Sequence, residues 1–209
     1  MKRRHYIFIL ILIPLLVLFR FVSKIGERTP GTYTVVRIID GDTVELTGGE
    51  TLRLLGIDTP EEGDPYHDSA KAYLAGMVLR KDVRVDTGHR KRDRYGRLLG
   101  YLYLDTILVN ARIIKNGYGW VYFFPEDQKE PEITGRLLAA QRVAMADTAG
   151  VWTLPYYAEE YYIGNSRSFR FHRPSCESAG DPTGKNRVTF STREEACFEG
   201  YSPCRNCRP

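Results

Sequence analysis

β-branched and other apolar residues cluster in five short stretches of the first half of the chain. Runs of this length and composition, bounded by turn residues, are typical of β-strands. Gly41 marks a turn after the first run, and the pair Gly48-Gly49 marks a hairpin turn after the second. The predicted strands are Thr34–Asp40, Thr43–Leu46, Thr51–Ile57, Val83–Asp86 and Leu98–Leu104.

A helical period of apolar residues predicts three helices. The first follows a loop, Pro60–Asp68, and its apolar face comprises Ala70, Tyr73, Leu74, Met77 and Val78. The others are Val109–Asn116, ended by Gly117, and Pro131–Thr148. Three strands, a helix, two strands and further helices predict an α+β domain at residues 32–155. Its expected architecture is a five-stranded antiparallel barrel with three helices, the oligonucleotide-binding (OB) fold.

The N-terminus differs from the rest of the chain. Lys2, Arg3 and Arg4 precede an apolar stretch that reaches Phe19. A helix over Tyr6–Val22 would be about 25 Å long, near the lower limit for crossing a bilayer. We expect residues 1–31 to be an uncleaved membrane anchor and linker, with the folded part outside the cytoplasm. The alternative is a signal peptide that is cleaved to release a secreted protein.

Composition adds little to this outline. The 209 residues are 43% hydrophobic and 27% charged, which is typical of a globular protein. A net charge of +4 and a pI near 8.8 permit a polyanionic partner without requiring one. Basic residues concentrate in the segment Arg84–Arg97, which we interpret as a solvated loop between two strands. Because it leads into Tyr95-Gly96-Arg97, attraction of phosphate is the favoured role.

Three acidic residues are the candidates for metal and proton chemistry. Asp42 follows a turn between strands, and Asp58 ends the third predicted strand. Carboxylate oxygens at such strand ends can converge and suit Ca²⁺, although Asp-Gly-Asp is also an ordinary turn sequence. Glu61 follows Pro60 and could take a proton from an attacking water, or be an exposed loop acid.

Two arginines accompany these acids. Arg53 lies within the third predicted strand, on the face opposite Leu52 and Leu54. Arg97 stands at the start of the fifth predicted strand. A planar guanidinium offers paired donors to phosphate oxygens and stabilises charge that develops on phosphorus. The alternative for each arginine is a surface ion pair.

Taken together, these residues resemble the staphylococcal (micrococcal) nuclease family over residues 34–152. The matching strings are Ile39-Asp40-Gly41-Asp42-Thr43-Val44, Arg53-Leu54-Leu55-Gly56-Ile57-Asp58-Thr59-Pro60-Glu61 and Asp93-Arg94-Tyr95-Gly96-Arg97. The resemblance implies an OB-fold barrel that hydrolyses DNA and RNA with calcium and leaves 3′-phosphate ends.

The resemblance also implies a role for each matching residue. Asp42 and Asp58 would bind calcium, helped by the carbonyl of Thr59, and Glu61 would act on the water. Arg53 and Arg97 would hold the phosphate, while Arg94 and Tyr95 would contact a neighbouring phosphate. The aromatic run after Gly117 differs in register from the best-known member. We name Tyr122 as the residue that stacks on a base, with core packing as the alternative.

The segment 156–209 contains all four cysteines and few aliphatic residues. It is too small to bury a good core alone and therefore needs a cross-link. His172 and Cys176 form one close pair of metal-ligand types, and Cys204 and Cys207 form a second. This spacing suits tetrahedral Zn²⁺. In an exported protein the alternative is disulfides, Cys204 with Cys207 and Cys197 with Cys176.

The same segment resembles the zinc-binding module of the Ada family of alkylation-repair regulators. The shared strings are Phe171-His172-Arg173-Pro174-Ser175-Cys176 and Gly200-Tyr201-Ser202-Pro203-Cys204-Arg205-Asn206-Cys207. A histidine replaces the family's first cysteine, which is its methyl acceptor, so methyl transfer is not expected. Cys197 is interpreted as a free thiol. Charge alone suggests that Arg167, Arg170, Arg173 and Arg205 contact nucleic acid.

These features lead to the hypothesis of an exported, calcium-dependent nuclease that acts on DNA and RNA and is anchored in the membrane. The alternative is a catalytically inactive nucleic-acid-binding module at the cell surface, which would not need the acid and arginine set. A structural surface protein would leave the same five residues without a role.

Overall fold

The computed structural model describes residues 31–179 and 184–209. Tyr33–Pro209 form one compact unit. The predicted N-terminal anchor, residues 1–31, lies almost entirely outside the described residues, so the anchor stays a prediction. Among the residues that are described, no helix is long and apolar enough to cross a membrane.

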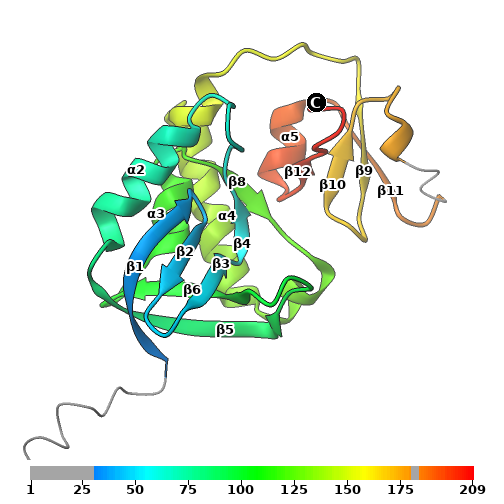
Figure 1. The fold of residues 1–209 in the computed structure, drawn as a ribbon. Coiled ribbons are helices and arrows are strands. Elements are labelled where there is room, and N and C mark those ends of the chain that lie inside the picture. Colours follow the sequence, from blue (N-terminus) through cyan, green and yellow to red (C-terminus); the bar gives the residue numbers. More distant parts are fainter. Residues whose placement is uncertain (1–30, 180–183) are drawn as a thin grey trace, which may run out of the picture. The chain divides into compact units, whose positions relative to one another are not determined.

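A closed barrel forms the first half of the described chain (Figure 1). One sheet has the order β3-β2-β1-β5-β6-β7, and a further parallel pairing of β3 with β6 closes it. Closure leaves the barrel without a free edge between these strands. The strands are β1 (Thr32–Asp40), β2 (Thr43–Leu46), β3 (Glu50–Leu54), β5 (Asp82–Arg92), β6 (Leu98–Leu104) and β7 (Ile107–Leu108).

The three predicted helices are present as α2 (His67–Val78), α3 (Val109–Lys115) and α4 (Pro131–Ala146). Each buries the apolar stripe that its sequence period defines, as with Ala70, Leu74 and Val78 of α2. These side chains join the barrel interior in one hydrophobic core, whose largest buried members include Tyr101, Leu46, Leu52, Leu54, Ile57, Leu102, Ile113 and Leu137.

Two strand predictions are wrong in their bounds. The third predicted strand is broken at Leu55 and continues as β4 (Gly56–Asp58), which pairs with a strand that was not predicted, β8 (Trp120–Tyr122). The buried Asn110 makes the break possible, because its amide donates to the Leu55 carbonyl over 2.8 Å. The basic segment Arg84–Arg97, predicted to be a loop, is mostly part of β5, because this strand continues to Arg92, which pairs with Leu98 of β6.

Two glycines allow close approaches of the backbone around β4. A Cβ on Gly41 would lie 2.7 Å from Thr59 Oγ1 and 2.8 Å from Ala70 Cβ. A Cβ on Gly119 would lie 2.3 Å from the carbonyl oxygen of Asp58. Contacts this short are not available to a larger residue, so both glycines bring the chain close to Asp58 and Thr59.

The C-terminal module, residues 156–209, has its own sheet and core. Its sheet has the order β11-β9-β10-β12, and α5 (Arg193–Phe198) packs with it. The strands are β9 (Tyr162–Asn165), β10 (Arg170–His172), β11 (Arg187–Phe190) and β12 (Ser202–Pro203). Aromatic residues supply most of the core, which comprises Tyr162, Phe171, Phe190, Ala196, Cys197 and Tyr201.

Buried hydrogen bonds join the module to the barrel domain. The side chain of Gln141, on α4, accepts from the Val121 amide over 2.8 Å and donates to the Cys197 carbonyl over 2.6 Å. Ser202 Oγ donates to the Val121 carbonyl over 2.8 Å. Because Gln141 and Ser202 are both fully buried, these bonds fix the module against β8.

Candidate active site

Asp42 and Asp58 converge at one end of the barrel. Asp42 lies in the turn between β1 and β2, and its carbonyl accepts from the Leu54 amide over 2.9 Å. Asp58 is the last residue of β4. Their side chains are only 7% and 5% exposed, so both carboxylates are almost fully desolvated. Buried carboxylates need a cation or hydrogen-bond donors nearby, and this site supplies both.

Arg53 bridges the two acids. Its Nη2 lies 2.8 Å from Asp42 Oδ2 and 3.0 Å from Asp58 Oδ1. Its Nη1 donates to the carbonyls of Leu54 and Ile57 over 2.6 and 3.0 Å. The break between β3 and β4 thus turns two carbonyls toward the guanidinium. Arg53 makes three hydrogen bonds and an ion pair with Asp42 in this arrangement, and these contacts hold the two acids next to each other.

Thr59 and Glu61 complete the acidic part of the site. The amide of Thr59 donates to Asp42 Oδ2 over 3.3 Å, whereas the predicted calcium ligand is its carbonyl, so that role stays a prediction. Glu61 is more than half exposed and pairs with Arg205 at 3.2 Å between Oε1 and Nη1. Burial raises the pKa of Asp58, while the cations Arg53 and Arg205 act in the opposite direction.

The predicted phosphate-binding residues share a cavity of about 510 Å³ next to these acids. Arg53, Arg94, Tyr95, Arg97 and Tyr122 all line this cavity. Arg97 Nε is held by Asp93 Oδ2 at 2.7 Å, which orients the guanidinium from one edge. Tyr95 is 68% exposed and its hydroxyl accepts from Arg94 Nη2 over 2.6 Å. The cavity therefore combines three predicted arginines with an accessible aromatic ring, a set that suits a nucleotide phosphate.

One face of the Tyr122 ring is covered by a residue from the module. The guanidinium carbon of Arg170 lies 3.3 Å from the ring centroid, and the Arg170 Nη1 donates to the Phe123 carbonyl over 3.0 Å. A base could stack on Tyr122 only from the other side. The ring also contacts Phe124 edge-on. Tyr122 therefore packs against other side chains, which was the alternative to base stacking, and it also lines the cavity.

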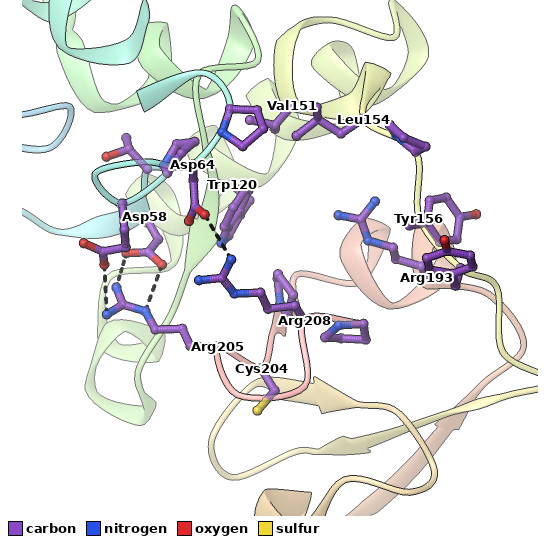
Figure 2. A pocket seen from close by; sticks show the side chains of 18 of the residues that line it. Asp58, Asp64, Trp120, Val151, Leu154, Tyr156, Arg193, Cys204, Arg205 and Arg208 are labelled. Atoms are coloured by element: carbon purple, nitrogen blue, oxygen red, sulfur yellow. Dashed lines mark hydrogen bonds and ion pairs between the residues drawn. The ribbon is translucent and has the colours of Figure 1, made fainter. Parts of the chain in front are cut away.

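Arg205 is the site residue that the sequence did not place. Its Nη2 lies 2.5 Å from Asp58 Oδ1, its Nε lies 3.3 Å from Asp58 Oδ2, and its Nη1 contacts Glu61 (Figure 2). Arg205 lies far along the chain from both acids, between the two terminal cysteines. The sequence marked it only as one of several basic residues in the module, because no local pattern reveals a contact at this separation.

His172, Cys176, Cys204 and Cys207 form one cluster in the module. Their ligand atoms all lie within 4.8 Å of one another, and His172 and Cys204 are buried. His172 Nδ1 is buried and has no hydrogen-bond partner among the described residues. Cys197 is not in this cluster; it is a buried free thiol, and burial raises its pKa to about 12. The donor set, three cysteine sulfurs and one imidazole nitrogen, fits zinc.

Comparison with known proteins agrees with the geometry of both parts. The family model described as staphylococcal nuclease homologue matches residues 51–154. Protein ParB of Escherichia coli is 34% identical over 139 residues, which cover 61% of this chain and 75% of that protein. The chain belongs to the staphylococcal nuclease family.

Other members of the staphylococcal nuclease family show the same extent of similarity. The thermonuclease of Staphylococcus hyicus is 30% identical over 140 residues, covering 63% of this chain and 81% of that protein. The micrococcal nuclease of Shigella flexneri is 32% identical over 142 residues, covering 61% and 76%. A second family model, the metal binding domain of Ada, matches residues 153–209. The cluster of His172 and the three cysteines lies within that second match.

Proposed function

We propose that this protein is a calcium-dependent nuclease that hydrolyses phosphodiester bonds of DNA and RNA and leaves 3′-phosphate ends. The observation that carries the proposal is the convergence of Asp42, Asp58 and Arg53 beside Glu61, at the edge of a cavity lined by Arg94 and Arg97. The similarity to thermonucleases and micrococcal nucleases supports the same reaction class.

The acids fit a calcium site in their chemistry. Asp42 and Asp58 offer carboxylate oxygens, the ligand type that Ca²⁺ takes, and their burial leaves them dependent on a nearby cation. In the structure that need is met by the guanidinium groups of Arg53 and Arg205. Asp42 and Asp58 would hold the ion, which when bound would stabilise negative charge on the phosphate oxygens.

The remaining roles follow from where each side chain lies. Glu61, exposed at the rim, would accept a proton from the water that attacks phosphorus. Arg97 is held at its Nε by Asp93 and would bind the phosphate with Nη1 and Nη2. Arg53 would release Nη2 from the acids when a metal cation neutralises them, and this group would then serve the phosphate.

The test is cleavage of single-stranded DNA by the full-length protein, with calcium and then with a calcium chelator. We expect cutting with calcium alone, and 3′-phosphate ends on the products. Cutting that survives the chelator would refute the calcium role. Absence of cutting in both conditions, with DNA still bound, would support the alternative of an inactive binding module.

Replacing the proposed base gives a sharper test. Glu61→Gln should lower the rate by about 10²- to 10⁴-fold, because general base catalysis typically contributes that much. Glu62→Gln is the matched control, since Glu62 is an exposed acid in the same loop. A Glu61→Gln variant as fast as the parent would remove Glu61 from this role.

We propose zinc as the metal of the cluster of His172 and the three cysteines. The ligand atoms are close enough to share one ion, and His172 Nδ1 needs a partner that protein atoms do not provide among the described residues. Binding there would supply the cross-link that a small core requires.

We also propose that the nuclease acts outside the cytoplasm, held by an N-terminal anchor. The support is the sequence alone, in which three basic residues, Lys2 to Arg4, precede an apolar stretch. Digestion of externally added DNA by intact cells would test this, and activity found only after lysis would contradict it.

A further inference from the structure

The guanidinium of Arg205 forms ion pairs with Asp58 and Glu61, two acids that the proposed mechanism requires. Nε and Nη2 of Arg205 approach the two oxygens of Asp58 at 3.3 and 2.5 Å, a fork that matches the carboxylate. Nη1 lies 3.2 Å from Glu61 Oε1. The same guanidinium therefore forms ion pairs with Asp58, a proposed calcium ligand (Figure 2), and with Glu61, the proposed base.

This arrangement conflicts with a calcium ion on Asp58. A ligand oxygen of Ca²⁺ lies about 2.3–2.6 Å from the ion, which would put two positive groups on one carboxylate. Arg205 already contacts both oxygens of Asp58, so its guanidinium and a dication on the same carboxylate would repel each other strongly at this short range. Either the ion or Arg205 holds Asp58.

The chain on either side of Arg205 belongs to the metal cluster, whereas the Arg205 side chain is half exposed. Arg205 lies between Cys204 and Cys207 of the metal cluster, and the Cys204 amide donates to the Phe171 carbonyl over 2.9 Å. The side chain is 54% exposed and lines both the phosphate cavity and a second cavity beyond Asp58. Displacement of the guanidinium from the acids would require a change of its side-chain rotamer into one of these cavities.

We propose that Arg205 is a built-in competitor of calcium, which neutralises Asp58 and Glu61 until the ion displaces it. This inference rests on the proposed calcium site. It makes the C-terminal module part of the nuclease site, because the metal cluster holds the backbone on either side of Arg205.

The test is the calcium affinity of the full-length protein without nucleic acid, measured by isothermal titration calorimetry. Arg205→Gln should bind calcium at least about tenfold more tightly than the parent, since a neighbouring charge shifts the cation affinity of a carboxylate by one or more powers of ten. Arg205→Lys, which keeps the charge, should stay near the parent. Arg208→Gln is the matched control, because Arg208 pairs with Asp64 at 3.0 Å and has no recorded contact with Asp58 or Glu61.

Equal calcium affinity in the parent and in Arg205→Gln would overturn the competition while leaving the calcium site intact. Weaker binding by Arg205→Gln would overturn it as well. If no variant binds calcium, the proposed calcium site fails and the competition fails with it. The amount of DNA cleaved at limiting calcium should follow the same order as the affinities.

A second cavity, of about 470 Å³, carries an independent inference. Asp58 and Glu61 line it, it shares Arg205 with the phosphate cavity, and the barrel domain and the module both contribute to it (Figure 2). Trp120, Leu154 and Tyr156 contribute to its walls. Nucleic acid held at the acids would therefore border this cavity directly.

The lining of this cavity combines exposed aromatic rings with arginines. Tyr157 is 84% exposed and Tyr156 is 41% exposed, and the Arg193 guanidinium lies 4.9 Å from the Tyr156 ring centroid. Unpaired bases stack on such rings, and arginines bind the phosphates between them. We infer that this cavity binds the nucleotides next to the cleaved bond in single-stranded nucleic acid.

The test is fluorescence anisotropy of labelled single-stranded DNA in the presence of a calcium chelator, with oligonucleotides of two and of eight nucleotides. Tyr157→Ala should weaken binding of the longer oligonucleotide by about 5- to 150-fold, the range for loss of one stacked base, and leave the shorter one unchanged. Tyr161→Ala is the control, because Tyr161 is exposed but does not line the cavity. Equal affinity of parent and Tyr157→Ala for the longer oligonucleotide would overturn the inference, whether or not the protein cuts DNA.

Discussion

Removal of Arg53 should destabilise the protein in a way that calcium repairs. Arg53 is 15% exposed and contacts Asp42 and Asp58, which are almost fully buried. Arg53→Met keeps most of the side-chain volume and removes the charge. Breaking a buried ion pair from one side costs about 3–5 kcal/mol, because the remaining charges stay buried without a partner. Arg205 still faces Asp58, so we expect the lower end of this range.

Calcium should then stabilise Arg53→Met more than it stabilises the parent. In the variant the ion meets carboxylates that have lost a competing cation, so its affinity should rise at least about tenfold. At saturating calcium, the free energy of unfolding should therefore increase by about 1.4 kcal/mol more in the variant than in the parent.

Urea denaturation of both proteins, with calcium and with chelator, measures both effects. Arg37→Met is the matched control, since Arg37 also lies on a barrel strand and pairs with Glu45 at 2.8 Å, but is 66% exposed. Its loss should cost less than about 1 kcal/mol, with no dependence on calcium. A loss below about 1 kcal/mol in Arg53→Met, or an equal calcium effect in parent and variant, would refute the reasoning.

Two further predictions concern the backbone at Asp58 and the metal cluster. Gly119→Ala should abolish cleavage, because its Cβ would lie 2.3 Å from the Asp58 carbonyl oxygen, whereas Gly135→Ala, which has open space, should cut like the parent. Cys207→Ser should lose the bound metal in elemental analysis, while Cys197→Ser should keep it, since Cys197 is outside the cluster. A Gly119→Ala enzyme with full activity, or a Cys207→Ser protein with full metal content, would contradict these expectations.

The module gives the active site neighbours that the barrel domain alone does not have. Arg170 covers one face of Tyr122, and Arg205 reaches Asp58 and Glu61. The two cavities that flank the acids both include Arg205. Because the cluster fixes the chain on both sides of Arg205, we expect loss of its metal to change the calcium affinity of the nuclease site.

Local patterns predicted much of the fold because their causes are local. The apolar period of α2, α3 and α4 predicts each helix within a few residues, since one face of each must be buried. The bounds of two strands have causes that are not local. The strand break at Leu55 depends on Asn110, a residue distant in sequence, and β5 extends through a charged segment because β6 offers a partner for it. Neither cause is present in a short window of sequence.

The sequence by itself determined the family, the barrel with its three helices, and the residue types of both candidate metal sites, because short motifs carry these properties. These motifs alone indicate Asp42, Arg53, Asp58 and Glu61 as candidate site residues. Only the tertiary structure decided what neutralises the acids and what surrounds them. Ion pairs depend on distance in space, and no sequence spacing reveals that Arg205 meets Asp58, because the two residues are distant in the chain.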